Sequence, residues 1–158
     1  FSLKNISSAS PKFSKEVLTN LNKNTLKNFN VQEVSSRISV LDKKLPQEML
    51  WKFSKNNINF FSEIKIFIDI IKSKNNIVNN NINSNFLDVA IETLPSEPYD
   101  EETWEKWTNL IKEKTNLKGK ELYLPLRIAL TGQDKGPEMK YLLPLLNKQN
   151  ILEKFGKI

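Results

Sequence analysis

Hydrophobic residues recur along this chain at intervals of three and four positions, the spacing that places side chains on one face of an α-helix. Strict alternation of hydrophobic and polar residues, the pattern of a half-buried strand, is scarce. The pattern therefore predicts helices over residues 14–22, 31–41, 62–72, 84–93, 122–130 and 148–155, and three more that begin at Pro46, Asp100 and Pro137.

Residues with known end preferences support several of these helix boundaries. Ser14 and Ser62 stand where N-caps are expected, and Pro46 suits the first turn of a helix. Asp100 opens a helix whose first turn is acidic and whose last turn is rich in lysine, as the helix dipole favours. Pro144 is expected to kink or end the last helix but one.

The segment 122–130 allows two interpretations. Its apolar residues could alternate as they do in a strand. Pro125 at a first helical position and Gly132 just beyond the end favour a short helix, which is the prediction adopted here. Gly119 would then end the preceding helix or lie in the turn that follows it.

The chain is long enough for one ordinary domain or for two small helical subdomains. The Asn-rich stretch 75–85 predicts a loop, because Asn favours turns over helices. The connector Leu94–Pro98 contains two prolines, which stiffen it and suggest a boundary nearby. We expect an all-α helical bundle with an initial segment at 1–30, a first subdomain at 31–94 and a second at 95–158.

Composition excludes several kinds of chemistry. The chain contains no Cys and no His, which removes disulfides, thiol nucleophiles, imidazole acid–base catalysis and the usual zinc ligands. The absence of Cys fits a reducing compartment. No apolar run is as long as a membrane span, so we expect no membrane partner.

The formal net charge is +6, and it is unevenly distributed. Residues 1–60 carry a net +6, residues 61–120 a net −2 and residues 121–158 a net +2. If the fold brings the two ends together, they would form a basic face suited to a polyanion such as a nucleic acid. A generally lysine-rich surface with no such partner is the alternative.

Several residues could carry binding chemistry. The acidic residues 100–102 could serve a metal or acid–base site, but a solvated helix N-terminus explains all three. Trp104 and Trp107 could stack on nucleic-acid bases, although they share an apolar helix face, which favours core packing. Lys52 and Lys55 could reach phosphates or simply be solvated, and both interpretations stay open. No nucleophile has a base at hand, so catalysis within this chain is not expected.

Arg127 stands in the apolar run at the start of LPLRIALTGQDKGPE, residues 124–138. Burying an Arg is costly unless it has an acidic or phosphate partner. It could fork onto a buried carboxylate or a helix C-terminus, or it could present its donors to an unstacked RNA base. Spacing alone leaves these two roles open.

The same string closely resembles the anticodon-binding region of bacterial glutamyl-tRNA synthetases. The likeness is highly specific over residues 99–138, which resemble the last helical subdomain of that family. Residues 1–26 resemble the stem-contact segment that follows the catalytic domain, while residues 45–85 match mainly in their apolar pattern. Neither class I ATP-site signature, HIGH or KMSKS, occurs here. The resemblance implies an all-α, C-terminal anticodon-binding part of a glutamate–tRNA ligase.

That resemblance also implies partners and cofactors. ATP, Mg²⁺ and glutamate would bind the catalytic domain, so no cofactor is expected in this chain, which should be inactive by itself. The partner would be tRNA, with glutamate tRNA expected and glutamine tRNA left open. A cytoplasmic monomer is expected.

By the same resemblance, Arg127 contacts the region of the first anticodon base, and the turn Gln133–Met139 lines the anticodon pocket. Some relatives use an Arg in the earlier bundle to read the third anticodon base. Trp51 and Lys52 occupy that place here, so the distinction between the two tRNAs stays open. The residues expected to bind tRNA are Arg127, Gln133, Lys135, Gly136, Pro137, Met139, Trp51, Lys52 and Lys55.

The alternative is a helical protein–protein interaction module without RNA binding. It predicts a basic surface with no concave pocket at Arg127.

Overall fold

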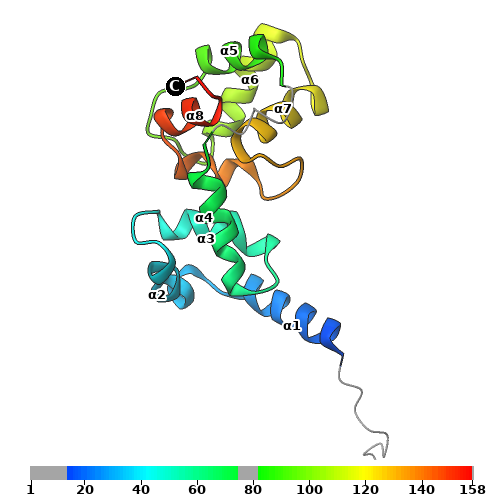
Figure 1. The fold of residues 1–158 in the computed structure, drawn as a ribbon, viewed down its shortest axis with the longest axis vertical. Helices are drawn as coiled ribbons and strands as arrows, with labels where there is room; N and C mark the ends of the chain where they lie inside the picture. The colour runs from blue at the N-terminus through cyan, green and yellow to red at the C-terminus, as the bar shows by residue number, and fades with distance from the viewer. Residues whose placement is uncertain (1–13, 75–81, 158) are drawn as a thin grey trace, which may run out of the picture.

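The computed structural model describes residues 14–74 and 82–157, and these residues form helices and connecting turns without a strand (Figure 1). The prediction of an all-α fold is confirmed. The α-helices are α1 (Lys15–Asn28), α2 (Val31–Leu41), α3 (Gln47–Ser54), α4 (Ile64–Lys72), α5 (Ser84–Glu92), α6 (Thr103–Thr115), α7 (Gly119–Thr131) and α8 (Lys148–Lys154). Short 3₁₀ helices cover Lys55–Asn57, Phe61–Glu63, Met139–Tyr141 and Leu143–Leu145.

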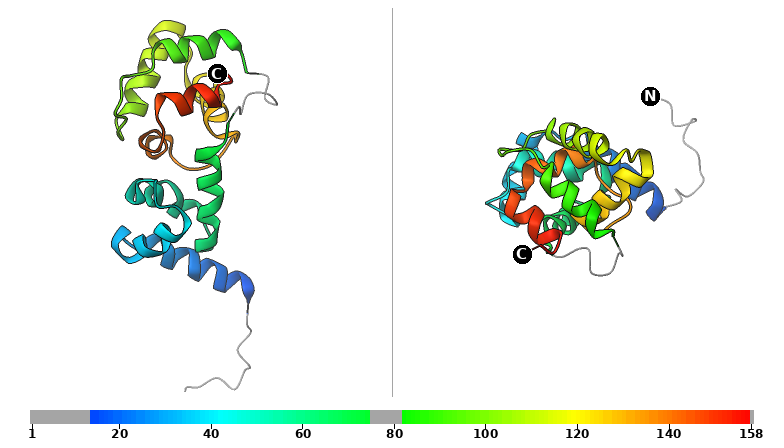
Figure 2. Two further views of the ribbon diagram at one scale, coloured as in Figure 1. Left: turned by 60° about the vertical axis from the view of Figure 1, so that its left-hand side comes forward. Right: turned by 90° about the horizontal axis from the view of Figure 1, so that it is seen from above.

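The helices fall into two groups along the long axis of the molecule. α1 to α3 lie at one end, α5 to α8 lie at the other, and α4 runs from the first group toward the second (Figures 1 and 2). The boundary predicted at residues 94 and 95 assigns α5 to the first subdomain, whereas α5 packs against α6. The subdomain limits 1–30, 31–94 and 95–158 stay a prediction.

The predicted N-cap is confirmed at Ser14 and wrong at Ser62. The Ser14 hydroxyl accepts the backbone N–H of Val17 at 3.4 Å, at the start of α1. Ser62 lies inside a 3₁₀ turn, and α4 begins at Ile64 with no side-chain cap. Glu63, the residue just before α4, accepts the backbone N–H of Asn59 with its carboxylate at 2.7 Å. This hydrogen bond stabilises the turn and not the first turn of the helix.

The helix predicted from Asp100 begins three residues later, at Thr103. The Asp100 carboxylate accepts the backbone N–H groups of Glu102 at 3.0 Å and of Thr103 at 2.8 Å, and so satisfies donors that the helix leaves free. Asn116, at φ 58°, ends α6 in the left-handed conformation. Gly119 is therefore not the end of this helix but the first residue of α7.

The helix predicted at 122–130 is present as α7, but it is longer than expected. Pro125 lies inside it rather than at its first position, since α7 already begins at Gly119. Gly132, at φ 72°, ends it as predicted, and its N–H donates to the Ile128 carbonyl at 2.7 Å.

The helix predicted to begin at Pro137 is wrong. Residues 133–138 have no helical structure, and the chain then makes two 3₁₀ turns. Gly136 has φ 144°, a backbone conformation outside the helical region that only Gly adopts readily. Pro144 has no N–H to donate and falls in the second turn, so a longer helix cannot form across it.

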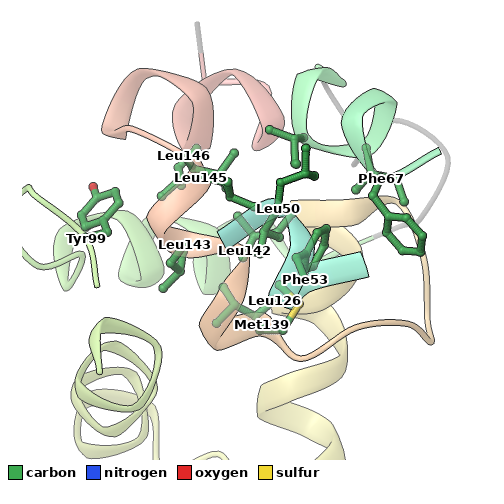
Figure 3. Close-up of a cluster of buried hydrophobic side chains, with 14 of the residues drawn as sticks. Leu50, Phe53, Phe67, Tyr99, Leu126, Met139, Leu142, Leu143, Leu145 and Leu146 are labelled. Carbon is green, nitrogen blue, oxygen red and sulfur yellow. The ribbon is translucent and has the colours of Figure 1, made fainter. Parts of the chain in front are cut away.

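One apolar core joins the two groups of helices. Leu50 and Phe53 of α3 lie beside Met139 and Leu142, and Leu126 of α7 packs next to them (Figure 3). All five side chains are buried. This core fixes α7 and the residues after it relative to the first group of helices, and it thereby holds Arg127 and its surroundings in place.

Lys154 of α8 is a buried lysine. Its side chain is fully inaccessible, and its ammonium donates to the carbonyls of Ile70 at 2.7 Å and Ser73 at 2.8 Å and to the Ser73 hydroxyl at 3.1 Å. These acceptors lie at the C-terminal end of α4, where carbonyls lack helical partners and the helix dipole favours a cation. Burial lowers the pKa of Lys154 to about 8. Lys154 therefore ties α8 to the helix that joins the two groups.

Candidate functional site

Arg127 lies on α7 with one side of its guanidinium turned into the protein. Its Nη1 atom is buried and has no hydrogen-bond partner, and burial lowers the pKa of the group. In residues 14–74 and 82–157 no carboxylate forms an ion pair with it. The structural role considered from the sequence, a fork onto a buried carboxylate, is therefore not found here. A buried donor left unpaired is costly, so its position needs another explanation.

The turn after α7 passes close to the Arg127 side chain. A Cβ placed on Gly136 would lie 3.7 Å from Arg127 Nη1 and 3.6 Å from Gln133 Oε1. The hydroxyl of Thr131 holds the beginning of this turn, because it donates to the Arg127 carbonyl at 2.8 Å and accepts the Gln133 N–H at 3.1 Å. These are ordinary contact distances, so Gly136 is required by its φ of 144° rather than by lack of space beside the guanidinium.

Two hollows border the Arg127 side chain, each of about 260 Å³. Both also reach Tyr123, one turn earlier on the same face of α7. The first, which we call the 104–140 hollow, is completed by Trp104, Glu138, Met139 and Lys140. The second is completed by Gly119, Lys120, Leu124 and Asp134.

Aromatic rings form one wall of the 104–140 hollow. The ring centroids of Trp104 and Tyr123 are 6.3 Å apart, and Tyr123 is exposed over 45% of its surface. The predicted core role is confirmed for Trp107, which is fully buried and donates its indole N–H to the Ala90 carbonyl at 2.8 Å. Trp104 is only half-buried and lines the hollow instead.

The turn residues predicted to bind RNA take different positions. Gln133, Lys135 and Gly136 are exposed, and Met139 is buried and lines the 104–140 hollow. Pro137 is buried, which leaves little of its ring for contact with a ligand.

Among the three residues predicted on α3 and just after it, Trp51 is buried, which leaves little of its ring for contact with a ligand. Its side chain is 2% exposed, and its indole N–H donates to the Phe29 carbonyl at 2.9 Å. Lys52 is half-buried and forms ion pairs, so it is not a free cation. Lys55 is half-buried and has no ion pair within the described part of the chain.

Sequence reasoning missed three residues at this site, Lys120, Tyr123 and Lys140. Tyr123 precedes Arg127 by four positions on a helix, and that spacing could have indicated a shared face. Lys140 follows the predicted turn, pairs with Glu138 at 2.8 Å and lies 4.8 Å from the centroid of the Tyr141 ring. The sequence predicted a helix from Pro137, and in such a helix Lys140 would not have its observed position.

Metal chemistry finds no support at the acidic residues 100–102. The Asp100 carboxylate is engaged by backbone N–H groups, and Glu101 and Glu102 pair with lysines. In the described residues no group of three or more acidic side chains is arranged to hold a metal ion. The same residues include no helix long and apolar enough to cross a bilayer.

Comparison with known proteins identifies related sequences over almost the whole chain. The family described as "Anticodon binding domain" matches residues 6–157. Glutamate–tRNA ligase 2 of Rickettsia canadensis (strain McKiel) is 33% identical over 154 residues, which cover 98% of this chain and 35% of that protein. Glutamate–tRNA ligase 1 of Ehrlichia ruminantium (strain Welgevonden) is 33% identical over 156 residues, which cover 99% and 35%. The chain thus spans about a third of the length of these curated relatives.

A solved structure shows the same fold. The glutamate–tRNA synthetase of Elizabethkingia anophelis aligns with a TM-score of 0.80 at 17% sequence identity, over 99% of this chain and 34% of that one. Together with the sequence relatives, this structure confirms the resemblance that residues 99–138 indicated.

Proposed function

This chain belongs to the anticodon-binding-domain family, and we propose that it binds the anticodon loop of a tRNA at the hollows beside Arg127. The relatives that share this segment are glutamate–tRNA ligases about three times as long as their match to it. We propose that it serves as the anticodon-recognition part of such a ligase. Attachment of glutamate to tRNA, with ATP and Mg²⁺, would then take place on a separate catalytic domain.

The observation that carries the proposal is the unpaired Nη1 of Arg127, buried at the edge of two open hollows. A guanidinium offers five N–H donors in a fixed plane, and it needs acceptors. Base edges of RNA supply such acceptors, with two of them often suitably placed for a bidentate contact. Arg127 as a whole is half-buried and borders both hollows, so an RNA base placed there would meet the accessible side of the guanidinium. The unpaired Nη1 shows that the protein itself supplies this group with no acceptor on its buried side.

The rest of the site suits an unstacked base. In a tRNA loop, bases can be splayed out and recognised on their edges, which a duplex does not allow. Trp104 and Tyr123 offer aromatic surface on which a base can stack. Lys120 and Lys135 are exposed nearby and can reach phosphates.

Which tRNA is preferred depends on the third anticodon base as well. By the family resemblance, Trp51 and Lys52 stand where some members have an Arg, and the Lys52 ammonium is held by two carboxylates. We propose that the chain binds glutamate tRNA and discriminates weakly against glutamine tRNA, because no guanidinium is available there for a bidentate base contact.

The test is direct binding of tRNA to this chain. Glutamate tRNA, the same tRNA with altered anticodon bases, and an unrelated tRNA are titrated against the protein and compared. Anticodon recognition requires that changing only the anticodon bases weakens binding. Equal affinity for all three, no better than for heparin, would remove the proposed function.

We expect binding to weaken as salt rises, because phosphate contacts release counterions. If two lysines neutralise phosphates, affinity falls about tenfold between about 50 and about 200 mM monovalent salt. The measurement is the dissociation constant at several salt concentrations, plotted on logarithmic axes. A flat line would contradict phosphate contacts by this chain.

A second candidate function is docking to another protein surface. Apolar side chains on one face of α1 favour this function. Together with Phe60, they border a hollow of about 470 Å³. Leu18, Leu21 and Phe60 are each more than 40% exposed. This face and the Arg127 site involve different residues, so the two functions are compatible.

A further inference from the structure

We propose that Glu101 restrains RNA binding by holding the ammonium of Lys52, so that replacing this carboxylate tightens tRNA binding. The inference rests on the proposed function and adds to it a residue that opposes the ligand. Glu101 belongs to the turn before α6, and Lys52 belongs to α3, so their contact joins the two groups of helices.

The geometry shows one cation shared by two anions. Lys52 Nζ lies 2.8 Å from Glu101 Oε1 and 3.0 Å from Glu48 Oε1. The hydrogen bonds from these carboxylates, that of Glu101 first, raise the pKa of Lys52 above its usual range. Two carboxylates and one ammonium leave a net charge of −1 at this point on a chain whose total is +6.

This negative group lies on elements that adjoin the proposed RNA site. Glu101 is three residues before Trp104, which lines the 104–140 hollow. α3 packs against Met139–Tyr141, the 3₁₀ turn that contributes Met139 and Lys140 to the same hollow. A phosphate bound beside that hollow meets a local excess of negative charge where a free lysine would attract it.

The Lys52–Glu101 ion pair contributes little to the stability of the fold. The side chains of Lys52 and Glu101 are 34% and 38% exposed, and ion pairs at that exposure add little to stability. The apolar core of Leu50, Phe53 and Met139 already holds α3 against the second group of helices. The main consequence of the ion pair is therefore electrostatic: it removes Lys52 from the cations available to RNA.

A matched pair of variants tests the proposal. Glu101→Gln and Glu102→Gln remove the same charge from adjacent positions, but Glu102 pairs with Lys106 of its own helix at 2.7 Å and not with Lys52. Affinity for glutamate tRNA is measured by titration at low salt, and melting temperatures are compared. We expect Glu101→Gln to bind about three- to fivefold more tightly than Glu102→Gln, because it raises the net charge of the Lys52 group from −1 to 0, whereas Glu102→Gln leaves that group at −1. Glu48 still holds Lys52 in this variant, so the salt slope should steepen by less than about one unit.

The double variant Lys52→Gln with Glu101→Gln should lose that gain, because its local charge is again −1, whereas Lys52→Gln alone should weaken binding, because it lowers the local charge to −2. If Glu101→Gln binds no better than Glu102→Gln, or binds less well, Glu101 does not restrain RNA and the inference is overturned. If Arg127→Ala still weakens tRNA binding in that case, only the inference about Glu101 is overturned and the proposed function stands. If tRNA affinity does not depend on Arg127 either, the proposed function falls with it.

Discussion

Replacement of Arg127 by alanine is expected to weaken tRNA binding about tenfold to a hundredfold, because a bidentate Arg–base contact contributes about 1–3 kcal/mol. The dissociation constant for glutamate tRNA is the measurement. The expected loss should be largest for the tRNA with its natural anticodon and smaller for one with altered anticodon bases. That difference separates a base contact from a general loss of positive charge.

The same substitution should not destabilise the protein. Arg127 Nη1 is buried without a partner, and no ion pair holds the side chain within the described residues. Removing an unpaired buried donor relieves a cost rather than creating one. Thermal unfolding of Arg127→Ala is therefore expected at or slightly above the wild-type temperature. A structural arginine would give the opposite result, with lower stability and lower binding together.

Arg127→Lys is the matched control. Lysine keeps the positive charge but loses the planar fork, so a base-reading role predicts loss of anticodon discrimination with the salt slope preserved. If the lysine variant keeps full discrimination, position 127 supplies charge only. If Arg127→Ala binds every tRNA as the wild type does, the hollows beside it are not the RNA site.

The helices could be predicted from the sequence wherever periodicity and end signals agreed. α2 begins and ends at the predicted residues, Val31 and Leu41, because its apolar spacing and its Asn30 cap act together. The chain after α7 could not be predicted in this way. Pro137 suits the first turn of a helix, but the preceding Gly136 takes a φ of 144° that a sequence pattern does not show.

The site was only partly predictable for a related reason. Arg127 could be singled out because an Arg in an apolar run requires a partner. Whether that partner is a carboxylate depends on side chains distant in sequence, and local spacing carries no information about them. Trp51 shows the same limit: the family alignment placed it at the RNA surface, whereas packing against Phe61 and a hydrogen bond to Phe29 bury it.

Lys154 gives the second large effect, which appears in the pH dependence of stability. Its pKa is about 8 in the folded protein, because burial disfavours the charged form, and 10.5 is its ordinary value. The negative charge of Glu153, its neighbour on α8, raises the pKa of Lys154 and so partly offsets the effect of burial. Glu153 itself pairs with Lys74 at 3.2 Å. The folded state thus releases the Lys154 proton at a lower pH than the unfolded state does.

The sign of the effect follows from the number of protons bound. Below pH 8 Lys154 is protonated in both states, so it adds no pH dependence. Between pH 8 and 10.5 the unfolded chain binds more protons than the folded one, and stability rises with pH. The shift corresponds to a gain of up to about 3 kcal/mol across this window. Deprotonation leaves two N–H donors for the three acceptors at Ile70 and Ser73, and the lost hydrogen bond reduces this gain.

Urea unfolding of the wild type and of Lys154→Met at pH 7 to 10.5 measures this contribution as a difference, since the other lysines are common to both proteins. The wild type should gain stability relative to Lys154→Met as pH rises, whatever the offset between them at neutral pH. Lys65→Met, which removes an exposed lysine from α4, should run parallel to the wild type. A difference between wild type and Lys154→Met that stays constant with pH would show that the Lys154 ammonium keeps its ordinary affinity for protons. The contacts with the α4 carbonyls would then outweigh the cost of burial.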